Sequence, residues 1–187
     1  MDWENTMRAG LELPTGRENE ILRIEPQALA IVDRFRQVGS SSPEAGGMLL
    51  ASIEPGLVRV VCATEPAQQD KRGRFSFMPA LGPQQRTIDR QFKSGLHYIG
   101  EWHPHPEACP RPSSVDLRSM SECFRLSKHQ LSGLVMIIIG TERTLEGLWV
   151  GLHSASAIRR LNPAAPGEAS ATHKESLPVL IVRRLNP

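Results

Sequence analysis

The strongest constraint on the fold of this chain is an unbroken apolar run, Leu-Val-Met-Ile-Ile-Ile, from Leu134 to Ile139. The run is far shorter than the roughly 20 apolar residues that span a bilayer, and short runs of this kind are typical of strands buried on both faces. The chain has 187 residues, of which 40% are hydrophobic and 22% charged, as expected for one globular domain with a real core. We therefore expect a sheet with helices on its faces.

The flanking patterns predict a mixture of helices and strands. Residues 26–39 start with proline, space Leu29, Val32 and Phe35 three apart and stop at glycine, which predicts an amphipathic helix. Pro55-Gly56 between two apolar segments predicts a hairpin. Strands are predicted at 45–54, 57–65, 73–80, 96–105, 131–141 and 145–155, and further helices at 83–93 and 113–129. Because these elements do not alternate strictly, the predicted fold class is α+β (mixed α/β), with a curved mixed β-sheet flanked by helices.

The two ends of the chain lack such patterns. Residues 1–20 mix charge, glycine and proline without periodicity and are predicted to be a flexible N-terminal arm before a domain at 21–161. Residues 162–187 are predicted to be a linker, rich in Ala, Pro, Ser and Gly, and a C-terminal strand or tail. Ile-Arg-Arg-Leu-Asn-Pro at 158–163 recurs as Val-Arg-Arg-Leu-Asn-Pro at 182–187. This echo is too short for a repeat architecture, and two equivalent strand ends, a local duplication and a cloning artefact all stay open.

Charge and cysteine content exclude several classes of function. The net charge is +2 and the basic residues are spread along the chain, which argues against a nucleic-acid groove. Three cysteines without a Cys-x-x-Cys pair predict neither a disulfide framework nor a four-cysteine zinc site. The acidic start does not match a secretory signal. We expect a cytoplasmic protein with no membrane or nucleic-acid partner.

Two histidines one residue apart carry the candidate chemistry. In a strand, His103 and His105 point to the same face and can bind one ion together. A proline-broken loop follows them, and Asp116 then falls in the first turn of the next helix. Two imidazoles and one carboxylate are typical of catalytic zinc, which keeps a fourth position open for water. Hydrolysis also needs a carboxylate base near the metal, for which Glu44, before two glycines, is the candidate.

Each of these residues also has a simpler interpretation. A His-x-His pair is often solvated, and Ser113 with Asp116 matches a helix capping box. By composition alone, Glu44 would be a solvated acid. Glu101 shares the face of the histidines and could support them or form a structural ion pair. Cys109 lies in the loop between the ligands, where we expect it to face substrate rather than to close the site as a fourth ligand.

The order Glu44, Gly46-Gly47, His103-x-His105-Pro106 and, after ten intervening residues from His105, Asp116 with Ser113 three before it, resembles the JAMM motif of JAB/MPN metalloproteases. The resemblance implies a single MPN/JAB-like (cytidine deaminase-like) domain that acts as a zinc isopeptidase or peptidase on ubiquitin-like proteins. It implies one Zn²⁺ per chain on His103, His105 and Asp116, Glu44 as base and acid, and Ser113 as an oxyanion donor.

The residues around the histidines resemble one bacterial branch of that family. Gly-Glu-Trp before His103 and Pro-Ser-Ser after the loop are similar to peptidases of CBASS antiphage operons and related ubiquitin-like conjugation operons. The partners implied are a ubiquitin-like protein, its conjugates and E1- and E2-like enzymes. Pro104 departs from the usual Ser or Thr between the histidines, so that point of the strand must lack a ladder partner for its missing N–H.

Three other functions are compared with this one. A peptidase that processes a sulfur-carrier protein shares the whole site, so the sequence does not separate it from a deconjugating enzyme. A non-catalytic MPN scaffold would commonly lack ligands, and the complete set here argues against it. A zinc nucleobase deaminase needs a later Pro-Cys-x-x-Cys, which this chain does not contain. The identity of the modifier, its target and the oligomeric state stay open at this stage.

Overall fold

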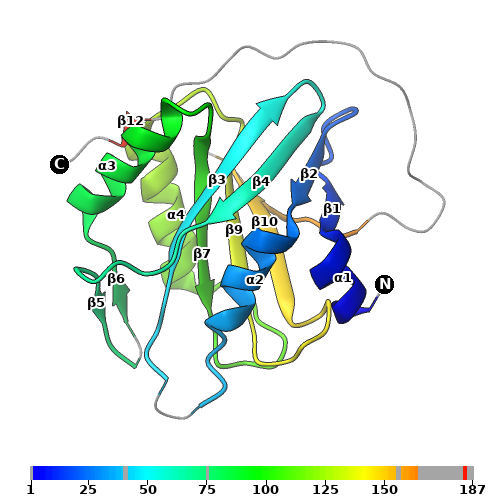
Figure 1. Ribbon diagram of the computed structural model, residues 1–187, viewed down its shortest axis with the longest axis vertical. Coiled ribbons are helices and arrows are strands. Elements are labelled where there is room, and N and C mark those ends of the chain that lie inside the picture. Colours follow the sequence, from blue (N-terminus) through cyan, green and yellow to red (C-terminus); the bar gives the residue numbers. More distant parts are fainter. Residues whose placement is uncertain (1, 40–41, 75, 155–156, 164–182, 185–187) are drawn as a thin grey trace.

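The computed structural model describes residues 2–39, 42–74, 76–154, 157–163 and 183–184 (Figure 1). The helices in this part of the chain are α1 (Trp3–Ala9), α2 (Pro26–Arg34), α3 (Leu81–Phe92) and α4 (Ser114–Leu126). The strands of the main sheet are β1 (Leu11–Pro14), β2 (Ile21–Ile24), β3 (Gly47–Glu54), β4 (Leu57–Ala63), β7 (His97–Pro104), β9 (Leu134–Ile139), β10 (Leu148–His153) and β11 (Ile158–Arg160). Two small ladders pair β5 (Lys71–Arg72) with β6 (Phe77–Met78) and β8 (Ser127–Lys128) with β12 (Arg183–Arg184).

The main sheet is mixed, as predicted. Its order among the described residues is β1-β2-β4-β3-β7-β9-β10-β11. The β2–β4 and β7–β9 pairs are parallel, and the other neighbours are antiparallel. The apolar run that forms β9 is buried at every position and lies between β7 and β10. The predicted class, an α+β domain with a mixed sheet flanked by helices, is confirmed.

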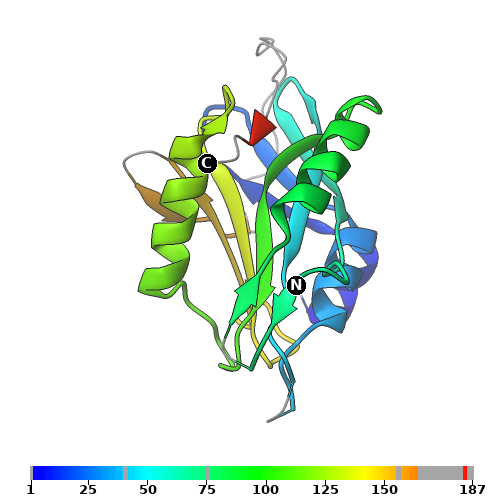
Figure 2. The same ribbon diagram turned by 90° about the vertical axis from the view of Figure 1, so that its left-hand side faces the viewer.

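Helices cover both faces of this sheet, so the core has two layers. Leu29 and Val32 of α2 pack with Leu49, Ile99 and other residues of one face. On the opposite face, Met120 and Cys123 of α4 and Ile88 of α3 pack with Met48, Tyr98 and Ile138. Figure 2 shows α4 on one side of the sheet and α1 and α2 on the other. The face under α4 is the one that carries the candidate site.

A β-bulge interrupts the pairing of β7 with β3. Leu49 pairs with Gly100 and Leu50 with Tyr98, so Ile99 has no partner on β3. Tyr98 and Ile99 pack in the cores on opposite faces, and Trp102 lies on the same face as Ile99. Because of the bulge, Glu101 and His103, the neighbours of Trp102, lie on the face of the sheet that α4 covers.

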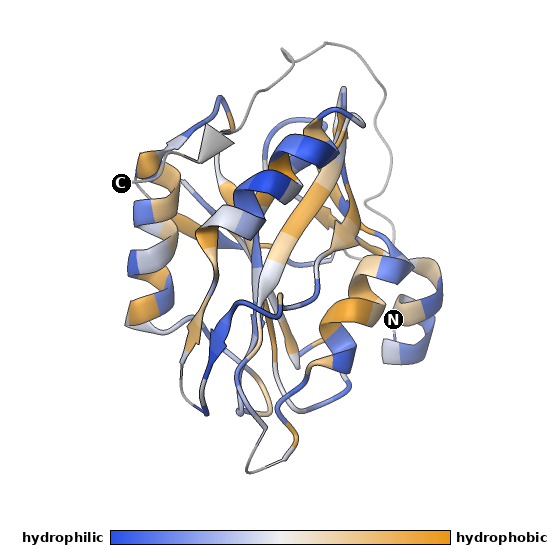
Figure 3. Ribbon diagram, turned by 60° about the vertical axis from the view of Figure 1, so that its left-hand side comes forward, coloured by the Kyte–Doolittle hydropathy of each residue, from blue (hydrophilic) through white to orange (hydrophobic). Residues whose placement is uncertain are grey.

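The predicted helices and long strands agree with the observed elements within a few residues. Figure 3 shows α3 mostly in the blue of hydrophilic residues, which fits the predicted helix with a largely wet surface. The strand predicted at 73–80 is reduced in the described residues to β6, which pairs with β5. Phe75, which that prediction used, lies outside the described residues. The short β5–β6 hairpin is separate from the main sheet and contacts the segment that leads into β3.

The prediction of a flexible arm at residues 1–20 is wrong for the described residues. Asp2 caps α1 by accepting a hydrogen bond from the Asn5 N–H (2.7 Å), and β1 pairs along its length with β2. Trp3, Leu11 and Leu13 are buried in the core. The absence of periodicity was misleading because these elements are short and are stabilised by tertiary packing.

The predicted linker and tail lie largely outside the described residues. The two Arg-Arg pairs of the sequence echo both fall in strands, but β11 pairs with β10 whereas β12 pairs with β8. Their strand positions are therefore not equivalent. None of the helices in the described ranges has the length and apolarity needed to cross a bilayer.

Candidate active site

The end of β7 holds the two histidines on the face of α4. The His105 backbone N–H donates to the Ile139 carbonyl of β9 (2.8 Å), so by alternation the Pro104 nitrogen faces β3, whose pairing with β7 ends at Gly47 and Trp102. Proline is therefore tolerated there because no ladder hydrogen bond is lost. This agrees with the prediction that the missing N–H of Pro104 has no ladder partner. The two imidazole centroids are 5.0 Å apart.

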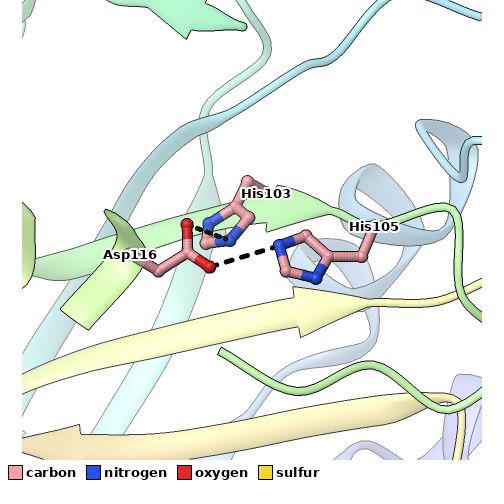
Figure 4. A group of neighbouring side chains, drawn as sticks. All are labelled: His103, His105 and Asp116. Carbon is pink, nitrogen blue, oxygen red and sulfur yellow. Dashed lines mark ion pairs between the residues drawn. The ribbon is translucent and has the colours of Figure 1, made fainter. Parts of the chain in front are cut away.

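The third residue of the group, Asp116, comes from the first turn of α4. Ser113 is the N-cap: its Oγ accepts from the Asp116 N–H (3.2 Å), and Asp116 Oδ2 accepts from the Ser113 N–H (2.6 Å). The predicted capping box is therefore present and fixes the carboxylate. Figure 4 shows both rings turned toward it. Asp116 Oδ1 is 3.3 Å from His103 Nε2, and Oδ2 is 3.3 Å from His105 Nε2.

This arrangement fits a divalent metal ion. One ligand atom from each of His103, His105 and Asp116 lies within 4.8 Å of the others. His103 Nε2 is buried without a hydrogen-bond partner among the described residues, which is costly unless an ion or a ligand satisfies it. Burial raises the pKa of the Asp116 carboxyl, but the adjoining imidazoles and Ser113 outweigh it and hold that pKa well below its usual range. The carboxylate is therefore ionised, as a ligand must be.

Glu44 lies in the segment that leads into β3 and faces the same cleft. Its backbone is held by the β5–β6 hairpin: the Glu44 N–H donates to the Gly73 carbonyl (2.8 Å), and Arg72 Nε donates to the Glu44 carbonyl (2.7 Å). Burial raises the pKa of Glu44, and the nearby imidazoles of His103 and His105 only partly offset this. A carboxyl with a raised pKa is suited to taking and returning a proton.

The two glycines after Glu44 permit close packing, as predicted. A Cβ on Gly47 would lie 2.1 Å from the Thr64 carbonyl oxygen and 2.6 Å from Trp102 Nε1. A Cβ on Gly46 would lie 2.7 Å from the Phe77 ring. The start of β3 can therefore approach β7 closely, and Glu44 lines the same cleft as His103, His105 and Asp116.

A cleft of about 730 Å³ contains all five predicted site residues. Its lining also includes apolar residues of β6, of the segment between β6 and α3, of α3 and of α4, where Val115 and Leu126 are exposed and Met120 is buried. These apolar residues are Phe77, Pro79, Leu81, Val115, Met120 and Leu126. The cleft thus has an apolar portion beside His103, His105 and Asp116, wide enough for an extended chain.

Other residues of the site differ in how well the sequence placed them. Glu101 lines the cleft and accepts a hydrogen bond from the Tyr98 hydroxyl (3.1 Å), a partner that the sequence did not suggest. Cys109 is a free, exposed thiol outside the ligand group. Glu107 was not among the predicted site residues, and its Oε2 is 3.3 Å from His105 Nδ1.

Comparison with known families agrees with this geometry. Residues 29–150 match the family described as prokaryotic homologs of the JAB domain. This range covers most of the chain and contains His103, His105, Asp116 and Glu44. The chain belongs to this family of JAB-domain proteins, and the predicted resemblance to JAB/MPN peptidases is confirmed.

Several curated relatives carry functional descriptions, and two of them are compared with the chain as follows. A "CD-NTase/cGAS isopeptidase" of Enterobacter hormaechei is 35% identical over 99 residues, which cover 52% of this chain and 55% of that protein. A "probable metalloprotease" of Sinorhizobium fredii is 32% identical over 115 residues, covering 58% of this chain and 70% of that protein. The chain thus matches about half the length of the first relative.

One solved structure supports the fold alone. The solution structure of a protein from Desulfitobacterium hafniense matches with a TM-score of 0.50 and 19% identity, over 74% of this chain and 87% of that protein.

Proposed function

We propose that this chain is a zinc-dependent JAB-family isopeptidase that hydrolyses the bond between the C-terminus of a conjugated protein and an amine. The observation that carries the proposal is the convergence of His103, His105 and Asp116 within 4.8 Å, in a cleft that also contains Glu44 and Ser113. His103, His105 and Asp116 would hold one Zn²⁺, with a position left for water. Zinc at such a site lowers the pKa of bound water and polarises a carbonyl.

The protein side chains then perform the proton transfers. Glu44 takes a proton from the attacking water and delivers it to the leaving amine, for which its raised pKa is suited. The oxygen of Ser113 accepts the Asp116 N–H, so its own O–H stays available to donate to the oxyanion. The two hydrogen bonds of the capping box therefore hold both the proposed metal ligand, Asp116, and the proposed oxyanion donor, Ser113, in position.

The description of the relatives favours a CD-NTase as the conjugated protein, in place of the ubiquitin-like modifier that the motif alone implied. We propose that the chain acts in the cytoplasm in an antiphage conjugation system, beside E1- and E2-like enzymes that form the linkage. The apolar cleft would hold the extended C-terminal segment of the conjugated protein along β6 and α4.

The test uses two fusion substrates, each joined through its C-terminus to a reporter protein. One carries a CD-NTase encoded beside this gene and the other a ubiquitin-like protein. Wild-type chain is compared with Glu44→Gln, with Glu54→Gln as the control at the other end of β3, and with chain treated with a chelator and then resupplied with Zn²⁺. Mass spectrometry locates the cleaved bond, and zinc content is measured for each protein.

We expect cleavage after the CD-NTase C-terminus, a fall of about 10²- to 10⁴-fold in Glu44→Gln, and wild-type activity in Glu54→Gln. Zinc should stay bound in both variants. Full activity of Glu44→Gln would reject the assigned base. Cleavage of the ubiquitin-like fusion alone would reject the CD-NTase as the substrate, and failure of the wild-type chain to bind zinc would reject the metalloenzyme.

A further inference from the structure

The imidazole of His105 lies between two carboxylates. Its Nε2 is 3.3 Å from Asp116 Oδ2, on the side of the metal group, and its Nδ1 is 3.3 Å from Glu107 Oε2 on the other side. The His105 side chain is 15% exposed, whereas that of Glu107 is 60% exposed. Glu107 therefore reaches from the exposed loop to the Nδ1 side of the partly buried His105 ring, opposite the metal group.

The backbone of Glu107 is fixed to the end of β9. The Thr141 N–H donates to the Glu107 carbonyl (2.9 Å), just as the Ile139 carbonyl accepts from the His105 N–H (2.8 Å). Gly140 lies between these two contacts, and a Cβ there would be 2.5 Å from the carbonyl oxygens of both Glu107 and Ala108. The loop can dock here only because residue 140 has no side chain.

A buried arginine supports the other side of this docking point. Arg36 Nη1 donates to the carbonyls of Gly140 and Glu142, both at 2.6 Å. Its Nε donates to Asp33 Oδ1 (2.5 Å), and its guanidinium lies 4.7 Å from the centre of the Trp3 ring. These contacts connect the segment after β9 to α2 and α1, so the position of Glu107 is set by the core.

We propose that Glu107 is a positioning residue for the metal site. Its carboxylate favours the His105 tautomer that carries its proton on Nδ1, which leaves the lone pair of Nε2 directed at the ion. This inference rests on the metal site of the proposed function. It assigns to the loop between the ligands a role in metal affinity, in addition to any contact with substrate.

The experiment measures Zn²⁺ affinity by competition with a chromophoric chelator, so its readout does not depend on peptidase activity. Glu107→Ala removes the carboxylate, Glu107→Gln keeps an oxygen acceptor at the same reach, and Glu146→Ala removes an exposed acid from the next loop as the control for charge. The absorption spectrum of the Co²⁺-substituted proteins reports the geometry of the ligands. The melting temperature of each metal-free protein checks the fold.

Loss of a hydrogen-bonding partner of a metal-binding histidine typically lowers metal affinity by about 10- to 100-fold. Because the Glu107 side chain is exposed and solvent weakens its interaction, the expected loss is about 10-fold. Glu107→Gln should recover part of it and Glu146→Ala should match wild type, with unchanged melting of the metal-free proteins. Equal Zn²⁺ affinity and Co²⁺ spectra in wild type and Glu107→Ala would overturn the positioning role. An equal loss in Glu146→Ala would overturn it in favour of general charge, and a wild-type chain that binds no Zn²⁺ would overturn the metal site itself.

Discussion

Substitution of Gly47 by alanine should destabilise the protein, because three elements meet at this position. The new Cβ would lie 2.1 Å from the Thr64 carbonyl oxygen, whereas ordinary contact begins at 3.4 Å. It would also lie 2.6 Å from Trp102 Nε1, which donates to that same carbonyl (2.9 Å). The backbone of β3 must therefore move by more than an ångström or the indole hydrogen bond must break.

Both routes cost free energy of unfolding. Overpacking a well-packed core costs about 1–3 kcal/mol, and leaving a buried donor unsatisfied costs about 1–3 kcal/mol. Alanine recovers about 0.4–1 kcal/mol by restricting the unfolded chain. Either route therefore leaves a net loss of about 1–2 kcal/mol, which corresponds to a fall in melting temperature of roughly 2–8 °C for a protein of this size.

Urea unfolding followed by tryptophan fluorescence, with thermal melting by circular dichroism, measures this loss. Gly82→Ala is the matched control, since the nearest atom to its Cβ would be the Arg86 guanidinium at 3.5 Å in the first turn of α3. It should be neutral or stabilising by up to about 1 kcal/mol. A Gly47→Ala protein as stable as wild type would refute the argument that close approach dictates glycine here.

Two further outcomes are expected. Ser113→Ala removes the acceptor of the Asp116 N–H and should cost about 1 kcal/mol in chemical denaturation, while peptidase activity falls by about 10²- to 10³-fold through the lost hydroxyl donor; Ser113→Thr should retain both, and equal activity of the alanine variant would exclude the oxyanion role. Partial burial raises the pKa of Glu25, but hydrogen bonds from Arg59 and Arg23 outweigh this and hold the pKa below its ordinary value of 4.5. Its ion pairs should therefore stabilise the protein fully above about pH 4.5 and progressively less as the pH falls through the depressed pKa. Urea titrations of wild type and Glu25→Gln should converge on acidification, and a difference that does not shrink would contradict this assignment.

Elements whose burial follows a regular pattern could be predicted from the sequence. The run at Leu134–Ile139 has no polar position, so it specifies a strand covered on both faces whatever its neighbours are. The α2 periodicity is equally local. By contrast, α1 has only 7 residues, too few to be stable in isolation. It is stabilised by its Trp3, which packs against Arg36, a residue outside this helix. A contact between residues so far apart in the sequence leaves no local pattern.

The site was predictable to the extent that its ligands obey a spacing. His103 and His105 follow strand alternation, and Asp116 follows capping chemistry at a helix start. Glu107 is different, because its contact with His105 depends on how the loop docks against Thr141, which is 34 residues further along the chain. Its role comes from the fold, and a count of residue types in the loop could not have revealed it.

The bulge at Ile99 also restricts how this strand can change in evolution. Tyr98 and Glu101 contact each other on one face although an odd number of positions separates them. If the bulge were lost while the strand kept its length and Tyr98 its packing, simple alternation would carry both histidines, five and seven positions after Tyr98, to the face of α2. Relatives that keep the site should therefore either keep both the bulge and the length of this segment of β7 or lose the extra residue together with the bulge, since a change in only one of them moves the histidines to the other face.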